Sequence, residues 1–351
     1  MSRLGDVLEL LRVAGVAGAR KLATHSGALK KYVRPYAVID CLVALEQGGL
    51  MERLRSPGGV DIRAEKGMDS RVLETVLEYL FENDLLRQHG PGRYTVKDPR
   101  AFEATLDAVY ACMAYRDPGH AISQLMSGRI RYGRDVVRSD KYDAVASATL
   151  TSKFSYGFAR GLILRSGARS VLDIGCGTGQ FLGYLAENGF SGRLYGMDQA
   201  EEAIQVGKAE QQAHANVQLF SGDALRLRES ARGHGVDVVE LVSFMFVMHE
   251  FDDTLVRGVV AGVADAFPSA RLLLTELLNR TSDELRRSRE TTVFPELKLV
   301  HRLSNQVLRD RDEWVTLLAS CGYRLLEENQ NNTANHVGLL FSRGGGNGAG
   351  A

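Results

Sequence analysis

The sequence predicts an α/β fold: a doubly wound, mainly parallel sheet that follows a smaller, mostly helical N-terminal region. The first observation is a short apolar segment, residues 171–174, that runs into a glycine-rich turn and then a helix near Phe181. The second is that further apolar segments alternate with helical stretches downstream of this turn. The third is that, before Arg165, apolar residues recur mainly at helical spacing. A chain of 351 residues is long enough for two domains with separate cores.

The composition argues against a nucleic-acid-binding, zinc-binding, secreted or membrane protein. The formal net charge is zero, so there is no overall field to attract a polyanion such as DNA. The four cysteines form no C-x-x-C pair, which favours a reducing compartment, the cytoplasm, and argues against a zinc site. Asp6 and Glu9 interrupt the first apolar stripe, unlike a signal peptide, and no apolar run approaches the roughly 20 residues that span a bilayer. We therefore expect a cytoplasmic protein with no nucleic-acid or membrane partner.

The N-terminal region, residues 1–100, reads as helices followed by a hairpin. Residues 6–18 have helical spacing, whereas the basic stretch that follows, up to Pro35, is expected to be irregular. Two helices are predicted between Tyr36 and Leu54, with a break at Gly48-Gly49. Asp69 is a plausible N-cap for a helix through Glu82, and residues 85–96 read as a hairpin.

This order of helix, turn, helix and hairpin describes a winged helix, which is either a DNA-binding or a dimerisation module. Residues 1–150 carry 22 lysines and arginines against 19 aspartates and glutamates, and the second helix presents Asp69, Glu74 and Glu78 beside Arg71. DNA affinity comes largely from neutralising phosphates. The electrostatics therefore favour dimerisation, and a DNA-binding regulator with a ligand-binding second domain is the alternative.

Residues 101–164 are expected to be a mostly helical linker that contains a basic, aromatic stretch, residues 129–138. The second domain, residues 165–343, is expected to continue with strands and helices in alternation, and the glycine-rich tail, residues 344–351, to be disordered. The strands expected in the second domain cover residues 193–198, 217–225, 236–251, 271–279, a segment from Tyr323, and 336–343. The helices expected there cover residues 252–267, 284–305 and 311–320.

The glycine-rich turn is the expected ligand site. Gly175, Gly177 and Gly179 allow a tight bend and let a ligand lie against bare backbone. Their G-x-G-x-G spacing differs from the dinucleotide fingerprint G-x-G-x-x-G, and Asp173 precedes them inside the strand. The next strand ends in Asp198, 19 residues after Gly179. This is about the interval at which a strand-end carboxylate binds ribose hydroxyls.

The segment DIGCGTG resembles the first motif of class I S-adenosylmethionine (SAM)-dependent methyltransferases, which have a Rossmann-like sheet. The resemblance implies that Asp198 binds the SAM ribose. It also implies that a third strand ending in Gly222, Asp223 and Ala224 lies at the adenine. With the four loop residues, the implied cofactor-binding set is Asp173, Gly175, Gly177, Gly179, Asp198, Gly222, Asp223 and Ala224.

The N-terminal half is similar to that of small-molecule methyltransferases in which a winged-helix domain forms an intertwined homodimer. In that family, the domain closes one wall of the acceptor pocket, and the linker supplies aromatic side chains. Tyr132, Phe154 and Tyr156 are the candidates here, although packing alone accounts for aromatics at helical spacing equally well.

For the chemistry, VMHEFDD resembles a motif of the related O-methyltransferases, in which the histidine is the general base. Carried over to this sequence, the base is His249, while Glu250 and Phe251 replace the aspartate and tryptophan of that motif. A neutral histidine suits proton abstraction near neutrality. Glu250 and Glu276, both near strand ends, are the other catalytic candidates because a pair of carboxylates fits an amine or guanidinium acceptor.

A metal is the alternative. His249, Glu250 and His301, the last also a substrate-binding candidate, form two histidines and one carboxylate, the ligand set of non-haem iron. The pattern is similar to bacterial 2-oxo-acid C-methyltransferases, in which iron or another divalent metal holds the substrate. The sequence therefore predicts a SAM-dependent methyltransferase acting on nitrogen or oxygen of a small polar acceptor, with metal-assisted C-methylation as the other reading.

Overall fold

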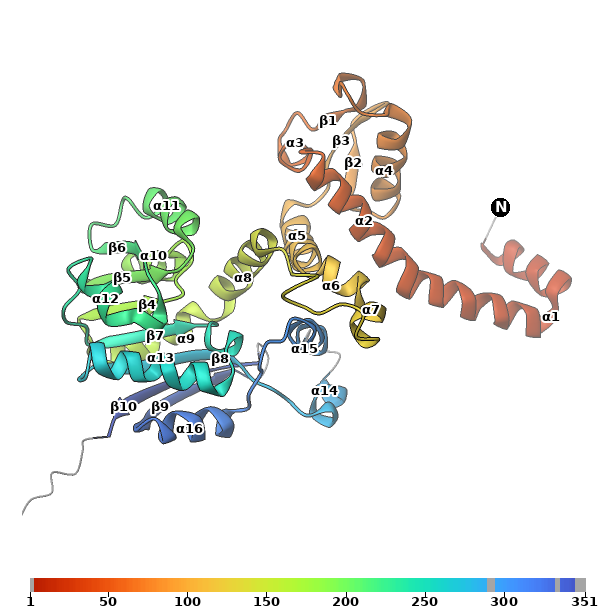
Figure 1. The fold of residues 1–351 in the computed structure, drawn as a ribbon. Coiled ribbons are helices and arrows are strands. Elements are labelled where there is room, and N and C mark those ends of the chain that lie inside the picture. Colours follow the sequence, from red (N-terminus) through yellow and green to blue (C-terminus); the bar gives the residue numbers. More distant parts are fainter. Residues whose placement is uncertain (1–2, 289–293, 332–334, 345–351) are drawn as a thin grey trace, which may run out of the picture. The chain divides into compact units, whose positions relative to one another are not determined.

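The computed structural model describes residues 3–288, 294–331 and 335–344, and all of the predicted tail except Gly344 lies outside them (Figure 1). The chain divides into two compact units, Met1–Met113 and Ala114–Ala351, each taken by itself below. No helix in the described ranges combines the length and the apolar character that crossing a bilayer requires.

The first unit begins with a continuous helical run. It consists of α1 (Arg3–Ala28), the π-helix η1 (Leu29–Val33) and α2 (Arg34–Gln47), with a kink at Gly15, where φ is +66°. The expectation of an irregular stretch before Pro35 was wrong. The stretch is rich in alanine, leucine, lysine and arginine, which are strong helix formers. Pro35 lies in the first turn of α2, directly after the π-helix η1.

The rest of this unit follows the sequence prediction. The break at Gly48-Gly49 separates α2 from α3 (Met51–Arg55), and Asp69 caps α4 (Ser70–Glu82) by accepting from two backbone N–H groups. The hairpin is formed by β2 (Leu86–Gln88) and β3 (Arg93–Val96). The remaining elements are β1 (Val60–Asp61), which pairs with β3, the 3₁₀ helix η2 (Ile62–Ala64) and α5 (Pro99–Ala114).

The second unit contains a seven-stranded sheet with the order β6-β5-β4-β7-β8-β10-β9. Five neighbouring strands are parallel, and β10 runs antiparallel to both β8 and β9. This arrangement confirms the doubly wound fold. The strands are β4 (Ser170–Ile174), β5 (Arg193–Asp198), β6 (Val217–Ser221), β7 (Leu241–Met245), β8 (Arg271–Leu277), β9 (Tyr323–Asn331) and β10 (His336–Arg343).

Helices cover both faces of the sheet and bury one core on each. Apolar side chains of α9, α10 and α11 form one core, and those of α12, α13 and α16 form the other. The helices of this unit are α6 (Arg116–His120), α7 (Ile122–Met126), α8 (Asp140–Phe154), α9 (Tyr156–Ser166), α10 (Gln180–Glu187), α11 (Glu201–Glu210), η3 (Ala224–Arg226), α12 (Leu227–Arg232), η4 (Met248–Glu250), α13 (Asp253–Ala266), α14 (Ser282–Ser288), α15 (Phe294–Leu303) and α16 (Arg311–Ser320).

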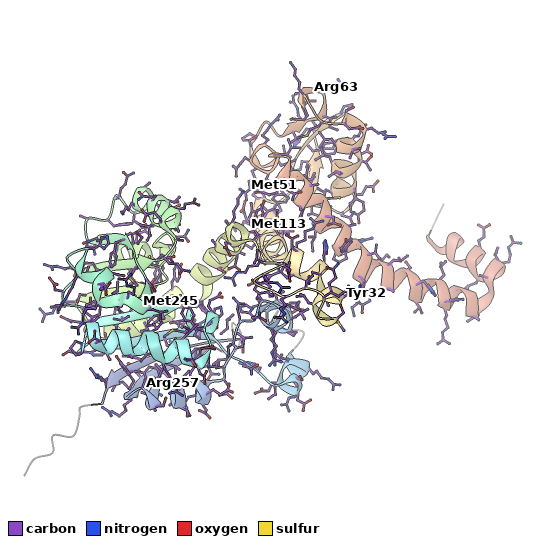
Figure 2. The ribbon with its side chains drawn as sticks, viewed as in Figure 1. Tyr32, Met51, Arg63, Met113, Met245 and Arg257 are labelled. Atoms are coloured by element: carbon purple, nitrogen blue, oxygen red, sulfur yellow. The ribbon has the colours of Figure 1, made fainter. Side chains whose placement is uncertain are left out.

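One strand prediction was wrong in a way that matters for the site. The apolar run was expected to stay extended to Phe251, but β7 ends at Met245, which Figure 2 labels. Phe246 has a φ of +58°, a left-handed conformation that is rare for a bulky residue and that turns the chain. Its N–H still donates to the carbonyl of Thr275 at 2.9 Å. The turn places His249 in η4, beside the end of β8.

Candidate functional site

The glycine-rich turn after β4 has the geometry of a ligand cradle. Gly175, Gly177 and Gly179 all have positive φ values. An added Cβ would lie 2.5 Å from Val247 at Gly175 and 2.9 Å from Leu219 at Gly179, so packing requires glycine at both positions. At Gly177, no atom of the described chain would lie within 4 Å of a Cβ. Gly177 therefore presents bare backbone beside open space.

Asp198 ends β5 next to this turn. One carboxylate oxygen accepts from the N–H of Gly177 and the other from the N–H of Ala200, both at 2.9 Å. The residue is only partly buried, and each carboxylate oxygen can accept a second hydrogen bond. Gly222 donates to the Asp198 carbonyl at 2.9 Å, which places the third predicted element beside the second.

The third element follows β6. A Cβ on Gly222 would lie 2.7 Å from the sulfur of Met197, so a side chain has no room there. Asp223 is exposed, and its carboxylate caps η3 by accepting from Leu225 at 2.8 Å. Ala224, the first residue of η3, packs against the sheet core. The structure thus brings the predicted SAM-binding residues to one edge of the sheet.

Asp173 lies beneath the turn rather than in it. It is 1% exposed, and its carboxylate accepts from the hydroxyl of Ser243 at 2.6 Å. Burial, partly offset by this hydrogen bond, raises the pKa of Asp173 to about 7. Tyr156 is also buried behind the turn, with its ring packed against Phe181 (5.1 Å between centroids) and Tyr184 (5.5 Å). Both side chains support the cradle from behind.

The second part of the site is a buried histidine–glutamate pair. His249 Nδ1 lies 2.7 Å from Glu276 Oε2, and the two residues are 5% and 0% exposed. Glu276 Oε1 also accepts from the backbone N–H of Met248 (2.7 Å) and of His249 (3.2 Å). Burial lowers the pKa of His249, but the Glu276 carboxylate outweighs it, and the net pKa is raised. Because the Glu276 carboxylate can only accept at this position, Nδ1 carries a proton, and in the neutral ring Nε2 carries the lone pair.

Glu250 lies beside this pair but is held by other groups. Its Oε1 is 3.8 Å from His249 Nε2, and the same oxygen accepts from Arg138 at 2.9 Å and from Gln306 at 2.5 Å. Tyr132, a predicted substrate residue, lies in the segment that carries Arg138, and its hydroxyl accepts from the Arg138 N–H at 3.4 Å.

His301, on α15, does converge with His249: their ring centroids are 5.1 Å apart. Its Nδ1 donates to the carbonyl of Leu297 at 2.7 Å, and Tyr115 stacks on its other side at 6.3 Å. Burial, together with the neighbouring His249, lowers the pKa of His301 to about 4, so the ring is neutral near pH 7.

The alternative metal ligands His249, Glu250 and His301 therefore lie near one another, but they do not form a coordination set. Within the described ranges, no three His, Cys, Asp or Glu side chains are grouped so as to hold a metal ion. The Arg138 guanidinium, 2.9 Å from Glu250, occupies the position of a cation at that carboxylate. These residues do not fit the iron site that the pattern suggested.

Sequence reasoning missed the side chains that surround this cluster. Arg138 also pairs with Asp143 at 3.3 Å, and Asp143 is hydrogen-bonded to Tyr115. From the other side, Val307 N–H donates to the His249 carbonyl at 2.7 Å, and Arg309 binds the Phe251 carbonyl at 2.9 Å. The only available signal was the basic stretch at residues 129–138, since the remaining residues belong to no motif.

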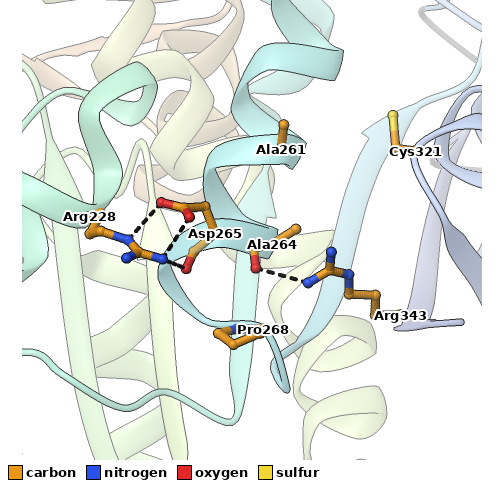
Figure 3. A pocket seen from close by; sticks show the side chains of 7 residues that line it. All are labelled: Arg228, Ala261, Ala264, Asp265, Pro268, Cys321 and Arg343. Atoms are coloured by element: carbon orange, nitrogen blue, oxygen red, sulfur yellow. Dashed lines mark hydrogen bonds and ion pairs between the residues drawn. The ribbon is translucent and has the colours of Figure 1, made fainter. Parts of the chain in front are cut away.

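A surface depression elsewhere on this unit is not part of the site. It is lined by residues of α12, α13 and the end of β10, including Arg228, Asp265 and Arg343 (Figure 3). Its charges already have partners: Arg228 pairs with Asp265 at 2.6 Å, and Arg343 donates to the Ala264 carbonyl at 3.0 Å.

Comparison with known proteins decides the class of enzyme. A family model described as a methyltransferase domain matches residues 171–266, which contain the glycine-rich turn, Asp198, Asp223 and His249. The chain is a SAM-dependent methyltransferase of class I. No curated protein matches this methyltransferase in sequence.

Solved structures share the fold of this methyltransferase along most of their length. LaPhzM is 18% identical, covers 91% of this chain and 99% of its own, and has a TM-score of 0.65. The mitomycin 7-O-methyltransferase MmcR is 16% identical, covers 93% and 99%, and scores 0.62. Human N-acetylserotonin methyltransferase, solved in complex with SAM, is 15% identical, covers 91% and 98%, and scores 0.68. The cradle at Gly177, with the open space beside it, fits SAM as the cofactor of this methyltransferase.

Proposed function

We propose that this methyltransferase transfers the methyl group of SAM to a hydroxyl oxygen of a small polar acceptor, with His249 as the general base. The buried His249–Glu276 pair is the observation that carries this proposal. The turn that holds the pair packs against the cofactor cradle, since Val247 fills the space beside Gly175. A base and a methyl donor held side by side are what O-methylation requires.

The chain's own groups prepare the acceptor. Glu276 holds the Nδ1 proton of His249, so Nε2 is free to accept the proton of a hydroxyl. SAM, when bound, supplies an electrophilic methyl group. Gly177, Asp198, Gly222 and Asp223 would hold it at the sheet edge, as the resemblance implies. Positioning the two reactants together contributes about 7–11 kcal/mol to such reactions.

Oxygen is favoured over a guanidine nitrogen for two reasons. A phenol has a pKa near 10, within reach of a histidine base, whereas a guanidinium has a pKa above about 12. In addition, the two glutamates considered for a guanidinium have other partners: Glu276 binds His249, and Glu250 binds Arg138. An amine that is already neutral needs no base and is the second acceptor class within the same proposal.

The test is an acceptor screen. The purified enzyme is incubated with SAM and with phenols, alcohols, amines, guanidines or phenylpyruvate, and mass spectrometry locates the new methyl group. We expect O-methylated products, formed at least 100-fold more slowly by His249→Ala. His89→Ala is the matched control because His89 is exposed in the N-terminal unit, where it contacts Thr95. Methylation of phenylpyruvate carbon alone, or full turnover by His249→Ala, would overturn the proposal.

We also propose that the chain forms a homodimer through its N-terminal unit. Large apolar side chains lie exposed along α1, η1 and the start of α2, the run on which Figure 2 labels Tyr32. They are Leu11, Val13, Val16, Leu22, Leu29, Tyr32, Val33 and Tyr36. An exposed apolar row of this length is typical of a protein interface. A second copy is the favoured occupant because the resemblance implies an intertwined dimer.

Light scattering coupled to size-exclusion chromatography tests the dimer. We expect a mass near twice 38.5 kDa for the wild type and a monomer for Val16→Asp combined with Leu22→Asp. The matched control, Arg12→Asp with Arg20→Asp, changes charge on the same helix without removing apolar area. A monomeric wild type contradicts the proposal.

We further propose that the protein is located in the cytoplasm. The four free thiols support this location because a reducing compartment keeps cysteines unpaired.

A further inference from the structure

Arg138 has no role in the proposed chemistry, although its guanidinium pairs with Glu250, the residue next to the base. It lies in the irregular segment between α7 and α8, at the end of the basic, aromatic stretch, residues 129–138. Its side chain is only 17% exposed and pairs with Glu250 at 2.9 Å, Asp143 at 3.3 Å and Asp140 at 3.8 Å. Of these three acidic residues, Asp143 is itself partly buried, whereas Glu250 and Asp140 are exposed. A long side chain is ordered here at the expense of its rotamer freedom.

The carboxylate that Arg138 holds has a second position available to it. Glu250 Oε1 lies 3.8 Å from His249 Nε2, too far for a hydrogen bond but close enough to form one after a small rotation. A carboxylate bonded to Nε2 would keep a proton on that nitrogen. The imidazole could then not accept the proton of an acceptor hydroxyl.

Two groups hold Glu250 away from His249. Arg138 and Gln306 both donate to Oε1, from opposite directions along the chain. Gln306 is fixed in turn, because its own carbonyl oxygen accepts from Ser304 at 3.1 Å. The Arg138 backbone N–H is held by the hydroxyl of Tyr132. Charge-assisted hydrogen bonds of this kind are about twice as strong as neutral ones.

The geometry points to Arg138 as a positioning residue that holds the Glu250 carboxylate off His249 and so keeps Nε2 open to the acceptor. This inference rests on the proposed role of His249 as base. The charged and titratable groups that face the imidazole come from several elements: Glu276 from β8, Glu250 from η4, His301 from α15, and, at the Arg138 side, Asp143 from α8 and Tyr115. Of the two carboxylates in this group that Arg138 binds, Glu250 is the one at the shorter distance, 2.9 Å, and its Oε1 lies 3.8 Å from Nε2.

The test first removes the Arg138 guanidinium and then, in a second variant, also the charge of Glu250. Arg138→Met should release Glu250 and lower turnover by about tenfold at pH 7, with recovery toward the wild-type rate as pH rises. The Michaelis constant for SAM should stay unchanged because Arg138 lies outside the cradle. Adding Glu250→Gln to Arg138→Met should restore most of the lost turnover, since the amide carries no charge to hold a proton on Nε2. Arg138→Lys should fall between the wild type and Arg138→Met.

A merely structural Arg138 gives a different pattern. In that case, Arg138→Met lowers turnover equally at all pH values, and Glu250→Gln restores nothing; either result overturns the inference. Thermal melts identify a variant that has lost its fold, and the double variant remains informative because it carries the same Arg138 change. Failure of the proposed function is separate: it appears as full turnover in His249→Ala, whatever Arg138→Met does.

Discussion

The sharpest perturbation of the site is Glu276→Gln, which keeps the size of the side chain and removes its charge. The amide oxygen can still accept from the N–H groups of Met248 and His249, now 2.7 and 3.2 Å from Oε1. The amide NH₂ group then faces His249 Nδ1, where a carboxylate oxygen lies at 2.7 Å. A donor at this position requires a lone pair on Nδ1, which moves the proton to Nε2. The histidine is then in the wrong tautomer to act as a base.

The magnitude follows from the interactions that change. A buried hydrogen bond to a charged group contributes about 1.5–3 kcal/mol. At about 1.4 kcal/mol per factor of ten, this alone corresponds to a roughly 10- to 150-fold loss of turnover. The tautomer change adds to it, because a neutral imidazole protonated at Nε2 must first shift its proton to Nδ1. We therefore expect turnover to fall by about 100- to 1,000-fold, less than the roughly 10⁴-fold loss when the tautomer-fixing aspartate of a Ser-His-Asp triad becomes an amide.

The assay measures the conversion of SAM to S-adenosylhomocysteine with an acceptor from the screen, and calorimetry measures SAM affinity in parallel. SAM affinity should stay within about threefold of the wild type because Glu276 lies outside the cradle. Glu240→Gln is the matched control: Glu240 also accepts from a backbone N–H, that of Arg169 at 2.9 Å, but at the opposite end of β7. If Glu276→Gln turned over within threefold of the wild type while binding SAM, Glu276 would not orient the base.

Three further predictions concern the cradle. Asp198→Ala should weaken SAM binding by about 10- to 100-fold in calorimetry, because the expected ribose acceptor and its bond to Gly177 are both lost; unchanged affinity would contradict the assignment. Gly177→Ala should reduce SAM affinity and lower the melting temperature only by the strain of its positive φ. Gly175→Ala should lower the melting temperature more because its Cβ also meets Val247; equal melting temperatures of the two variants would refute this prediction. Asp173→Asn should raise the free energy of unfolding at pH 8 relative to the wild type but not at pH 4. The raised pKa of Asp173, about 7, means that the stability gained with its proton is complete below about pH 4 and lost as pH rises through 7; urea titrations at both pH values check this difference.

Several elements of the second unit could be predicted closely because their signals are local, whereas the expected helix 284–305 is two elements, α14 and α15, in the described residues. Asp310 and Asp252 both cap helices that begin one residue later, and α16 has the predicted bounds. The glycine-rich turn could be recognised because its backbone needs positive φ values. The end of β7 could not be predicted, because the run of apolar residues continues through Phe246, and nothing in their order marks a left-handed residue.

Some residues of the candidate site could likewise be predicted from the sequence, and others could not. Asp198 ends β5 and His249 follows β7, and the carboxyl ends of parallel strands meet at one edge, so their convergence could be expected. Arg138 and Gln306 contact Glu250 across 112 and 56 residues of chain, and such contacts depend on how loops pack rather than on any periodic pattern. The dimer, the acceptor and the lack of nucleic-acid partners stay predictions.

The left-handed turn at Phe246 determines where the residues after β7 lie relative to Glu276. A non-glycine residue in this conformation costs about 1–3 kcal/mol and persists only where surrounding contacts require it. Here, the turn aims two successive N–H groups, those of Met248 and His249, at Glu276. A fully buried carboxylate needs such donors, because burial without them costs several kcal/mol. With the His249 ring as its third donor, the buried Glu276 carboxylate has a partner at both oxygens, and its contact with Nδ1 fixes the tautomer of the base. The hydrogen bonds that the turn allows at Glu276 therefore offset the backbone strain at Phe246. A variant that straightens this turn should lose the activity of His249 as a base at a smaller loss of stability than unfolding requires.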